Sequence, residues 1–329
     1  MAGQFRTKVP SVSYPFQLTH QQAVLCYGSC FAEHMAGRLR DRKFKIQLNP
    51  FGITYHPLQI AAGISALLEG HTLKTTDLFR YNELWQAFDF HSQFSHPVKE
   101  QALQQMNDSI KGSAEFLQQV DLLIVTLGTA YGFIEKESRK LVNNCHKLPA
   151  DQFERKRFRP EEMIQPLEKV FKVLKDQHPQ LKVLLTVSPV RHLKDGMVEN
   201  QRSKAALLLT VADLVERLEF VHYFPAYELV MDDLRDYRFF HTDMVHPNNL
   251  AVDYIWSYFQ HALFDQPTQQ LNTQIEKIQL ASEHRPFHPN TERHQAFLQK
   301  QIAKIKELQK EHPDLDFSQE QQIFANQLQ

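Results

Sequence analysis

The sequence predicts an α/β fold in which a mostly parallel β-sheet carries helices on both faces. Two observations support this prediction. Short apolar runs that are typical of buried strands alternate along the chain with longer segments whose apolar residues recur at helical spacing. The chain also has 329 residues, of which 42% are hydrophobic, and this is enough to bury one large core or two smaller ones.

The predicted strands are apolar runs rich in Val, Leu or Ile, each bounded by polar or turn residues. A run that is apolar throughout is typical of a parallel strand with both faces covered, because neither face meets water. These runs are residues 23–27, 122–127, 182–187 and 220–224, and a weaker candidate is residues 44–48.

The predicted helices lie between and after these strands. In residues 160–179 the apolar side chains share one helical face, Pro160 stands at the first helical position and Pro179 follows the end. The same periodicity predicts helices in residues 200–219 and 246–264. Because helices and strands alternate, a parallel sheet is favoured over an antiparallel one.

A change in composition near residue 262 indicates two parts. Residues 1–262 are predicted to form one domain of catalytic size, in which residues 71–120 are a mostly helical or irregular insertion. Residues 263–329 are rich in Gln and are predicted to be a helical extension. We expect one amphipathic helix of this extension to pack on the core or on a second copy, as in a homo-oligomer. Its apolar face consists of Leu298, Ile302, Ile305 and Leu308.

The charge balance and the cysteine content exclude several classes of protein. Lys and Arg number 37 and Asp and Glu 38, so no basic excess predicts binding to nucleic acid or to a membrane surface. No apolar run is long enough to span a bilayer, and the first residues lack the apolar core of a secretion signal. Three cysteines in so long a chain do not form a disulfide scaffold, so a reduced cytoplasm is the predicted location.

Polar residues follow each predicted strand, and this clustering predicts a binding or catalytic site. In an open parallel sheet, ligands bind beyond the carboxyl ends of the strands. The segments at those ends are residues 28–30, 49–52, 128–132, 188–192 and 241–248.

Ser29 stands where the first strand meets a helix, and it has two interpretations. As the residue before a helix it can cap free N–H groups. On a tight turn after Gly28 it can instead act as a nucleophile, because the helix dipole favours the anion that develops beside it. Cys30 competes for that role, since a thiolate is the better intrinsic nucleophile, although a small buried cysteine is the more common state.

Asp243 and His246 form a second candidate feature. An Asp three residues before a His can accept a hydrogen bond from the imidazole Nδ1–H within one turn, which leaves Nε2 free to act as a base. The plain alternative is surface polarity before a helix, with Asp243 as its cap. An early Ser behind Gly together with a late D-x-x-H favours ester chemistry over that alternative.

The chain resembles the GSCFA family over roughly residues 15–260. The segment GSCFA at residues 28–32 is the signature of that family. Further matching segments are NPFGITYHP at 49–57, TLGTAYGF at 126–133, NCHKLP at 144–149, TVSPVRH at 186–192 and DMVHPN at 243–248. The family is related in outline to the SGNH/GDSL hydrolases and the PC-esterases, so the resemblance implies a flavodoxin-like α/β/α fold.

The resemblance also implies three catalytic residues. Ser29 matches the nucleophilic serine of the G-D-S turn, although this chain reads G-S-C. Asp243 and His246 match the D-x-x-H of the hydrolases, in which the Asp orients the His and the His acts as the base.

An oxyanion hole is implied in the same way. The N–H of Ser29 and the N–H of Gly52 match two of its donors in the related hydrolases. The third donor is normally an Asn after the next strand, but this chain has GTA there. Because loss of one donor costs about 100–1000-fold in rate, we expect Thr129 or Asn144 to replace it.

Four further residues are candidates for substrate binding. They are Cys30, Asn49, His146 and Arg191. Three of them also have a structural interpretation: Asn49 can hold its turn, His146 can be a buried histidine with hydrogen-bond partners, and Arg191 can form an ion pair.

The predicted function is therefore that of a serine ester hydrolase or O-acyltransferase. It would remove or transfer a small acyl group, such as acetyl, on a saccharide or similar alcohol, and this substrate class is implied by the resemblance alone. No metal or organic cofactor is implied. One alternative is a metal-dependent hydrolase that uses Cys30, His34, Cys145 and His246. Another is a non-catalytic carbohydrate-binding protein with the same fold, for which the missing Asn is the best argument.

Overall fold

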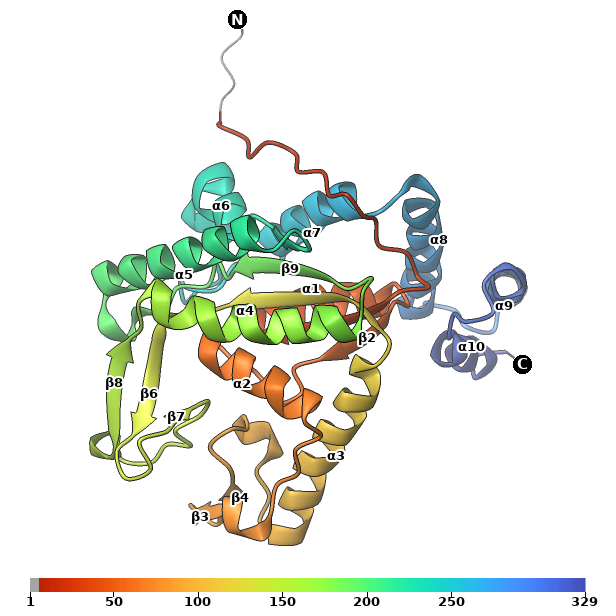
Figure 1. The fold of residues 1–329 in the computed structure, drawn as a ribbon. Helices are drawn as coiled ribbons and strands as arrows, with labels where there is room; N and C mark the ends of the chain where they lie inside the picture. Colours follow the sequence, from red (N-terminus) through yellow and green to blue (C-terminus); the bar gives the residue numbers. More distant parts are fainter. Residues whose placement is uncertain (1–5, 329) are drawn as a thin grey trace, which may run out of the picture.

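The computed structural model describes residues 6–328, and a five-stranded parallel sheet forms its centre (Figure 1). The strands lie in the order β2-β1-β5-β9-β10. Their bounds are β1 (Ala23–Gly28), β2 (Lys45–Leu48), β5 (Val120–Leu127), β9 (Lys182–Val187) and β10 (Val221–Tyr223). Counted along the chain, this is the 2-1-3-4-5 order of flavodoxin-like folds, so the predicted fold class is confirmed.

Alternate residues of each strand face opposite layers of helices, which explains why the strands are apolar throughout. On β1, Leu25 and Tyr27 belong to one buried cluster, whereas Val24 and Cys26 belong to the other. The helices of the first layer are α2 (Pro57–Leu68), α3 (Lys99–Leu117), α4 (Pro160–Gln177) and α5 (Met197–Arg217). Those of the second are α1 (Cys30–Asp41), α6 (Ala226–Glu228), a π-helical turn (Leu229–Leu234) and α7 (Asn249–Leu263).

The predicted strands and helices of the central fold are confirmed, with shifts at their ends. The strand predicted over residues 182–187 has those bounds in β9, and the weaker candidate at 44–48 is β2. The three predicted helices are α4, α5 and α7. Pro160 is the first residue of α4, where its missing N–H leaves no helical bond unmade.

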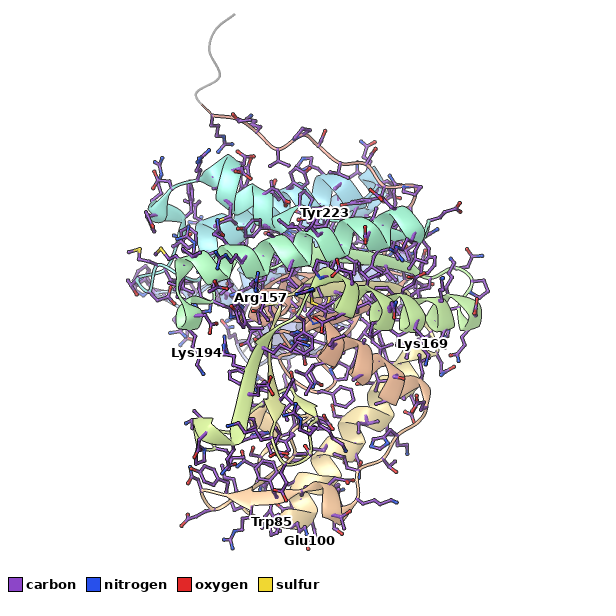
Figure 2. All side chains as sticks on the ribbon, turned by 60° about the vertical axis from the view of Figure 1, so that its left-hand side comes forward. Trp85, Glu100, Arg157, Lys169, Lys194 and Tyr223 are labelled. Atoms are coloured by element: carbon purple, nitrogen blue, oxygen red, sulfur yellow. The ribbon has the colours of Figure 1, made fainter. Side chains whose placement is uncertain are left out.

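The segment 71–120 differs in part from the predicted insertion. Its first part is irregular except for 3₁₀ turns and the hairpin of β3 (Phe79–Tyr81) and β4 (Leu84–Gln86). Figure 2 shows Trp85 of this hairpin at the opposite end of the molecule from Tyr223 of β10. The rest is α3, which packs on the core and leads into β5, so it belongs to the central fold.

A second sheet extends from the carboxyl edge of the first, and the sequence did not predict it. In this sheet β6 (Tyr131–Glu135) pairs antiparallel with β7 (Leu141–Val142) and with β8 (Phe153–Arg157). The sequence of β8 is FERKR, in which four charged residues follow one Phe. A strand of this kind has no apolar run that a pattern can detect.

The C-terminal residues form three helices around a small core of their own. These helices are α8 (Gln266–Glu283), α9 (Glu292–Glu311) and α10 (Ser318–Ala325). Leu298, Ile305 and Leu308 of α9 are buried in this core, so the apolar face that we expected to meet the main core or a second copy packs on α8 and α10. None of the helices in residues 6–328 is long and apolar enough to cross a membrane.

Candidate functional site at the carboxyl edge of the sheet

The loops that follow β1, β2 and β5 meet at the carboxyl edge of the sheet, as predicted. The chain passes from β1 to β2 on one side, but from β5 it passes to β9 on the other. Such a reversal of strand order opens a crevice in doubly wound sheets. Hydrogen bonds tie the loops together: the Thr54 N–H donates to Gly28 O (2.9 Å), and the Gly128 N–H donates to Tyr55 O (2.8 Å).

Gly28 makes the turn between β1 and α1 possible. Its φ is 151°, and a Cβ at this position would stand 2.2 Å from Thr126 O. Its N–H donates to Asn49 Oδ1 (2.8 Å), so Asn49 holds this turn, and its part in substrate binding stays a prediction. The Asn49 Nδ2 is buried and has no hydrogen-bond partner among residues 6–328.

Ser29 and Cys30 differ in whether a substrate can reach them. Ser29 is fully buried, and its hydroxyl has no hydrogen-bond partner in the described chain, not even as a cap of α1. Cys30 is the first residue of α1 and is partly exposed. The backbone N–H groups of Cys30 and Phe31 face its sulfur. The predicted nucleophile is therefore shielded, whereas its neighbour is accessible.

Asp243 and His246 form the pair that the D-x-x-H spacing predicts. His246 Nδ1 lies 2.7 Å from Asp243 Oδ2, and Asp243 Oδ1 accepts the N–H groups of Val245 (2.9 Å) and His246 (3.0 Å). These N–H groups and the imidazole hold the pKa of the Asp243 carboxyl well below its usual range. The expected hydrogen bond is thus confirmed, while the catalytic role of the pair stays a prediction.

The D-x-x-H loop lies beside the first turns of α1. Val245 of the loop and Cys30 of α1 pack against the same buried cluster. Burial lowers the pKa of the His34 imidazole, and the nearby His241 and His246 lower it further. The Arg191 N–H after β9 also donates to Val245 O (3.4 Å). The loop that carries Asp243 and His246 therefore lies near the first turns of α1, although the two segments are far apart in the sequence.

Lys204 is a buried cation at this edge that sequence reasoning missed. From α5 its Nζ donates to Gly128 O (2.7 Å) and to Ser188 O (2.7 Å), and so it joins the ends of β5 and β9. Burial lowers its pKa to about 7. A signal was present, because Lys204 lies three and seven residues before the buried Leu207 and Val211, on the apolar face of α5.

The predicted oxyanion donors at this edge are already engaged in hydrogen bonds within the protein. The Ser29 N–H donates to Thr126 O (3.2 Å), and the Gly52 N–H donates to Asn49 O (2.8 Å) to close its turn. The Thr129 N–H donates to Tyr55 O (3.2 Å). These groups shape the loops, so a hole built from them is not preformed.

Asn144 and His146 lie against the insertion instead of at the carboxyl edge. The Asn144 amide Nδ2 donates to Ser92 Oγ (3.2 Å). The His146 ring is buried, with Nε2 2.8 Å from Ala87 O, and burial lowers its pKa. Both side chains thus hold the loop after β7 on the insertion.

A cavity of about 360 Å³ adjoins the site between the β6–β8 sheet and the loop after β9. Tyr55, Thr129 and His192 line it on the side of the central sheet. Burial, helped by Lys204, lowers the pKa of His192 to about 3, so that imidazole is neutral. The remaining lining residues include Tyr131, Phe133, Arg155, Arg191 and Lys194.

The cations of this cavity differ in how they are compensated. Arg155 pairs with Asp195 through two nitrogens. Arg191 and Lys194 have no carboxylate within ion-pair distance in the described part of the chain. Arg191 lies over the rings of Tyr237 and Phe240. The cavity therefore carries an excess of positive charge.

The side chains of the alternative metal site do not come together. Among residues 6–328, no group of three His, Cys, Asp or Glu side chains is close enough to hold a metal ion. The set of Cys30, His34, Cys145 and His246 is therefore not assembled in this fold.

Comparison with known protein families gives two matches. Residues 23–259 match the GSCFA family, and residues 275–329 match the GSCFA domain protein, C-terminal domain. No curated protein matches the chain. The first match covers more than half of the sequence and includes all five strands of the central sheet.

Proposed function

We propose that this chain, which belongs to the GSCFA family, is an acyl ester hydrolase or acyltransferase whose nucleophile is the thiol of Cys30. The observation that carries the proposal is the position of the Asp243–His246 pair beside the helix start that presents Cys30. The relationship to SGNH/GDSL hydrolases that we expect from the sequence supports the same class of reaction.

The proposal moves the nucleophile from Ser29, which the sequence favoured, to Cys30. A hydroxyl shielded from solvent cannot approach a substrate carbonyl, whereas a partly exposed thiol at the first helical position can. The position in the motif supports the change, because the nucleophile is the third residue of G-D-S and Cys30 is the third residue of G-S-C. Ser29 then occupies the place of the middle Asp.

In the proposed reaction, His246 Nε2 removes the thiol proton and the thiolate of Cys30 attacks the acyl carbonyl carbon. The N–H groups of Cys30 and Phe31 stabilise the oxyanion, since they have no partner within the helix. The ester C–O bond then breaks, and the imidazolium returns its proton to the leaving alcohol. Water or a second alcohol attacks the resulting thioester by the same route and restores the thiol.

A general base is needed because the thiol is not ionised in advance. Burial and Glu33 raise the pKa of Cys30, whereas the N–H groups of α1 and the buried Lys204 lower it, and the net direction is upward. Asp243 stays ionised and keeps the proton of His246 on Nδ1. Nε2 is thereby left as the acceptor that the reaction requires.

The adjoining cavity favours a substrate that carries an anionic group next to its acyl ester. Arg191 and the exposed Lys194, which is labelled in Figure 2, line it without a carboxylate partner among residues 6–328. A guanidinium binds a carboxylate or phosphate through two parallel hydrogen bonds. An O-acylated saccharide that bears such a group fits both this cavity and the substrate class that the resemblance implies.

We expect Arg191→Gln to raise KM for 4-acetoxybenzoate by about 10–100-fold, because a charge-assisted hydrogen bond is lost. The value of kcat should change little, since the guanidinium takes part in no proton transfer of the proposed reaction. Steady-state kinetics with phenyl acetate, which lacks the carboxylate, provide the control and should show no change in KM. An equal increase in KM for the two esters would contradict an anion site.

Trapping the acyl intermediate tests the proposed function. The protein is mixed with p-nitrophenyl acetate, quenched in acid and digested, and we expect an acetyl group on the peptide that begins near β1, bound to Cys30. The adduct should be absent in His246→Ala, which lacks the base. An acetyl group on Ser29, or ester turnover without any adduct at Cys30, would refute the proposal. Saccharide binding without turnover of any ester would favour the non-catalytic alternative.

A further inference from the structure

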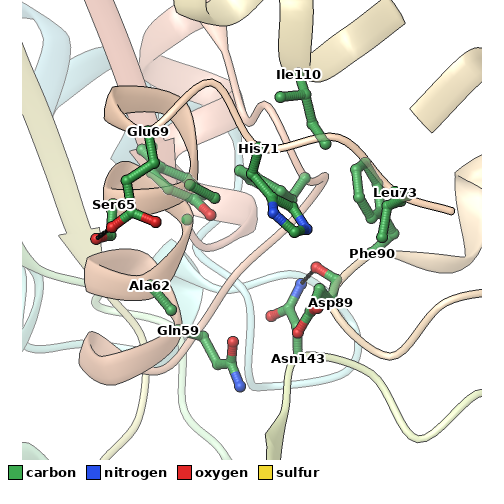
Figure 3. Close-up of a pocket in the computed structure, with 14 residues that line it drawn as sticks. Gln59, Ala62, Ser65, Glu69, His71, Leu73, Asp89, Phe90, Ile110 and Asn143 are labelled. Carbon is green, nitrogen blue, oxygen red and sulfur yellow. Dashed lines mark hydrogen bonds between the residues drawn. The ribbon is translucent and has the colours of Figure 1, made fainter. Parts of the chain in front are cut away.

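A second cavity of about 360 Å³ lies away from Cys30, between α2, α3 and the insertion (Figure 3). Its apolar part is formed by Phe51, Leu73, Phe90 and Ile110, together with the ring of Tyr27. Cavities of this size bind small organic molecules in many proteins. None of the proposed catalytic residues lines this cavity, and it shares only Asn143 with the cavity that adjoins the site.

The two amide side chains of this cavity, Gln59 and Asn143, have free oxygens and engaged nitrogens. Gln59 Nε2 donates to Leu141 O, and Asn143 Nδ2 donates to Ile53 O (3.4 Å) and Asp89 O (3.4 Å). All of these partners are carbonyl oxygens, which fixes the orientation of both amides. No donor within residues 6–328 bonds to the oxygen of either amide, so each is available as an acceptor.

The charged side chains that line the cavity are acidic. Asp89 and Glu69 line it together with the imidazole of His71, and no Lys or Arg of the described chain does. Glu69 accepts the hydroxyl of Ser65 (2.8 Å), as the dashed line in Figure 3 shows. Asp89 remains exposed to solvent, and its carboxylate has no hydrogen bond or ion pair within residues 6–328. Partial desolvation raises its pKa, although Lys140 and His71 act against this. An unpaired carboxylate next to two free amide oxygens makes a rim of acceptors.

We propose that this cavity binds a small primary amine with an apolar body, whose ammonium group contacts Asp89. An ammonium group has three donors and no acceptor, which matches a rim of carboxylate and amide oxygens. Its positive charge compensates Asp89 and Glu69, and its hydrocarbon part covers the aromatic and aliphatic wall. A carboxylate or phosphate ligand is disfavoured here because it would face acceptors and like charge.

A pair of probes with nearly the same shape tests this proposal. We expect phenethylamine to bind the full chain saturably at pH 7 with a dissociation constant in the millimolar range or below, measured by calorimetry or protein NMR. Its uncharged counterpart 2-phenylethanol should bind at least about tenfold more weakly, because it lacks the charge-assisted hydrogen bond. Asp89→Asn keeps the shape of the side chain and should reduce amine affinity to that of the alcohol.

Two matched variants make the result specific to the cavity. Asp108→Asn removes an exposed carboxylate from α3 outside the cavity and should leave amine binding unchanged. Ala62→Trp, on the exposed part of the α2 wall, should fill the entrance and abolish binding of both probes. Equal affinity for amine and alcohol, preference for the amine retained in Asp89→Asn, or no saturable binding of phenethylamine would each overturn the proposal.

Discussion

Replacing Cys30 by alanine is expected to lower kcat/KM for p-nitrophenyl acetate by about 10³-fold or more, whereas Ser29→Ala should retain it within about tenfold. The thiol at the first position of α1 is partly exposed, and it is the group from which His246 would take a proton. The Ser29 hydroxyl is buried and makes no hydrogen bond within residues 6–328, so its removal breaks no interaction. Release of p-nitrophenol, followed with matched protein concentrations, measures both effects.

Cys145→Ala is the matched control for this experiment. Cys145 is the other partly exposed thiol of the described chain, and it lies in the loop after β7 instead of at the helix start. Its removal should leave ester turnover unchanged, which excludes a non-specific thiol reaction. If Ser29→Ala is inactive and Cys30→Ala is active, the hydroxyl is the nucleophile. If none of the three changes matters, the site lies elsewhere.

The replacement of Lys204 by methionine should produce the largest effect on stability, and the size of this effect depends on pH. Burial lowers the pKa of Lys204 from 10.5 to about 7, so between these values the unfolded chain binds more protons than the folded one. The free energy of unfolding of the unchanged protein therefore rises with pH through this window, and the stability gained above pH 10.5 is lost as pH falls towards 7. Because each pKa unit corresponds to about 1.4 kcal/mol, the shift from 10.5 to about 7 changes the free energy of unfolding by about 5 kcal/mol across this pH range.

Lys204→Met has no proton to lose, and it leaves the oxygens of Gly128 and Ser188 without their donor. An unpaired buried carbonyl costs about 1–3 kcal/mol. Relative to the unchanged protein, the variant should therefore lose several kcal/mol more of its free energy of unfolding at pH 10 than at pH 7. Urea unfolding at both pH values measures this difference. Lys169→Met, which replaces an exposed lysine of α4, should show no such change. If the free energy of unfolding changes with pH in the same way in Lys204→Met and in the unchanged protein, the lowered pKa of Lys204 is refuted.

Much of the central fold was predictable because its signals are local. A strand that is apolar throughout is read from one short segment, as in β9, and Pro160 marks the start of α4 by its own covalent structure. The contact of His246 with Asp243 is local too, since a spacing of three residues brings the imidazole to the carboxylate within one turn. These features need no partner from elsewhere in the chain.

The candidate site was only partly predictable, because access and hydrogen bonding depend on the whole fold. The motif placed Ser29 and Cys30 at the right turn, but it could not say which of them faces the buried side. Likewise, Gly52 and Thr129 lie near the expected edge, but their N–H groups are used to close loops. Asn144 follows a hairpin that has no apolar pattern in the sequence. Its contact with Ser92 of the insertion could therefore not be predicted.

The sequence by itself determined the parallel sheet, its main helices, the family and the Asp243–His246 pair, because each depends on residues that are close along the chain or on a shared motif. Only the tertiary structure decided that the thiol of Cys30 is partly exposed while the hydroxyl of Ser29 is buried. It also decided that Lys204 is buried between two strand ends and that an acidic cavity lies beside α2. The physical reason is that burial and charge compensation are set by side chains distant in sequence, which packing brings to the same place.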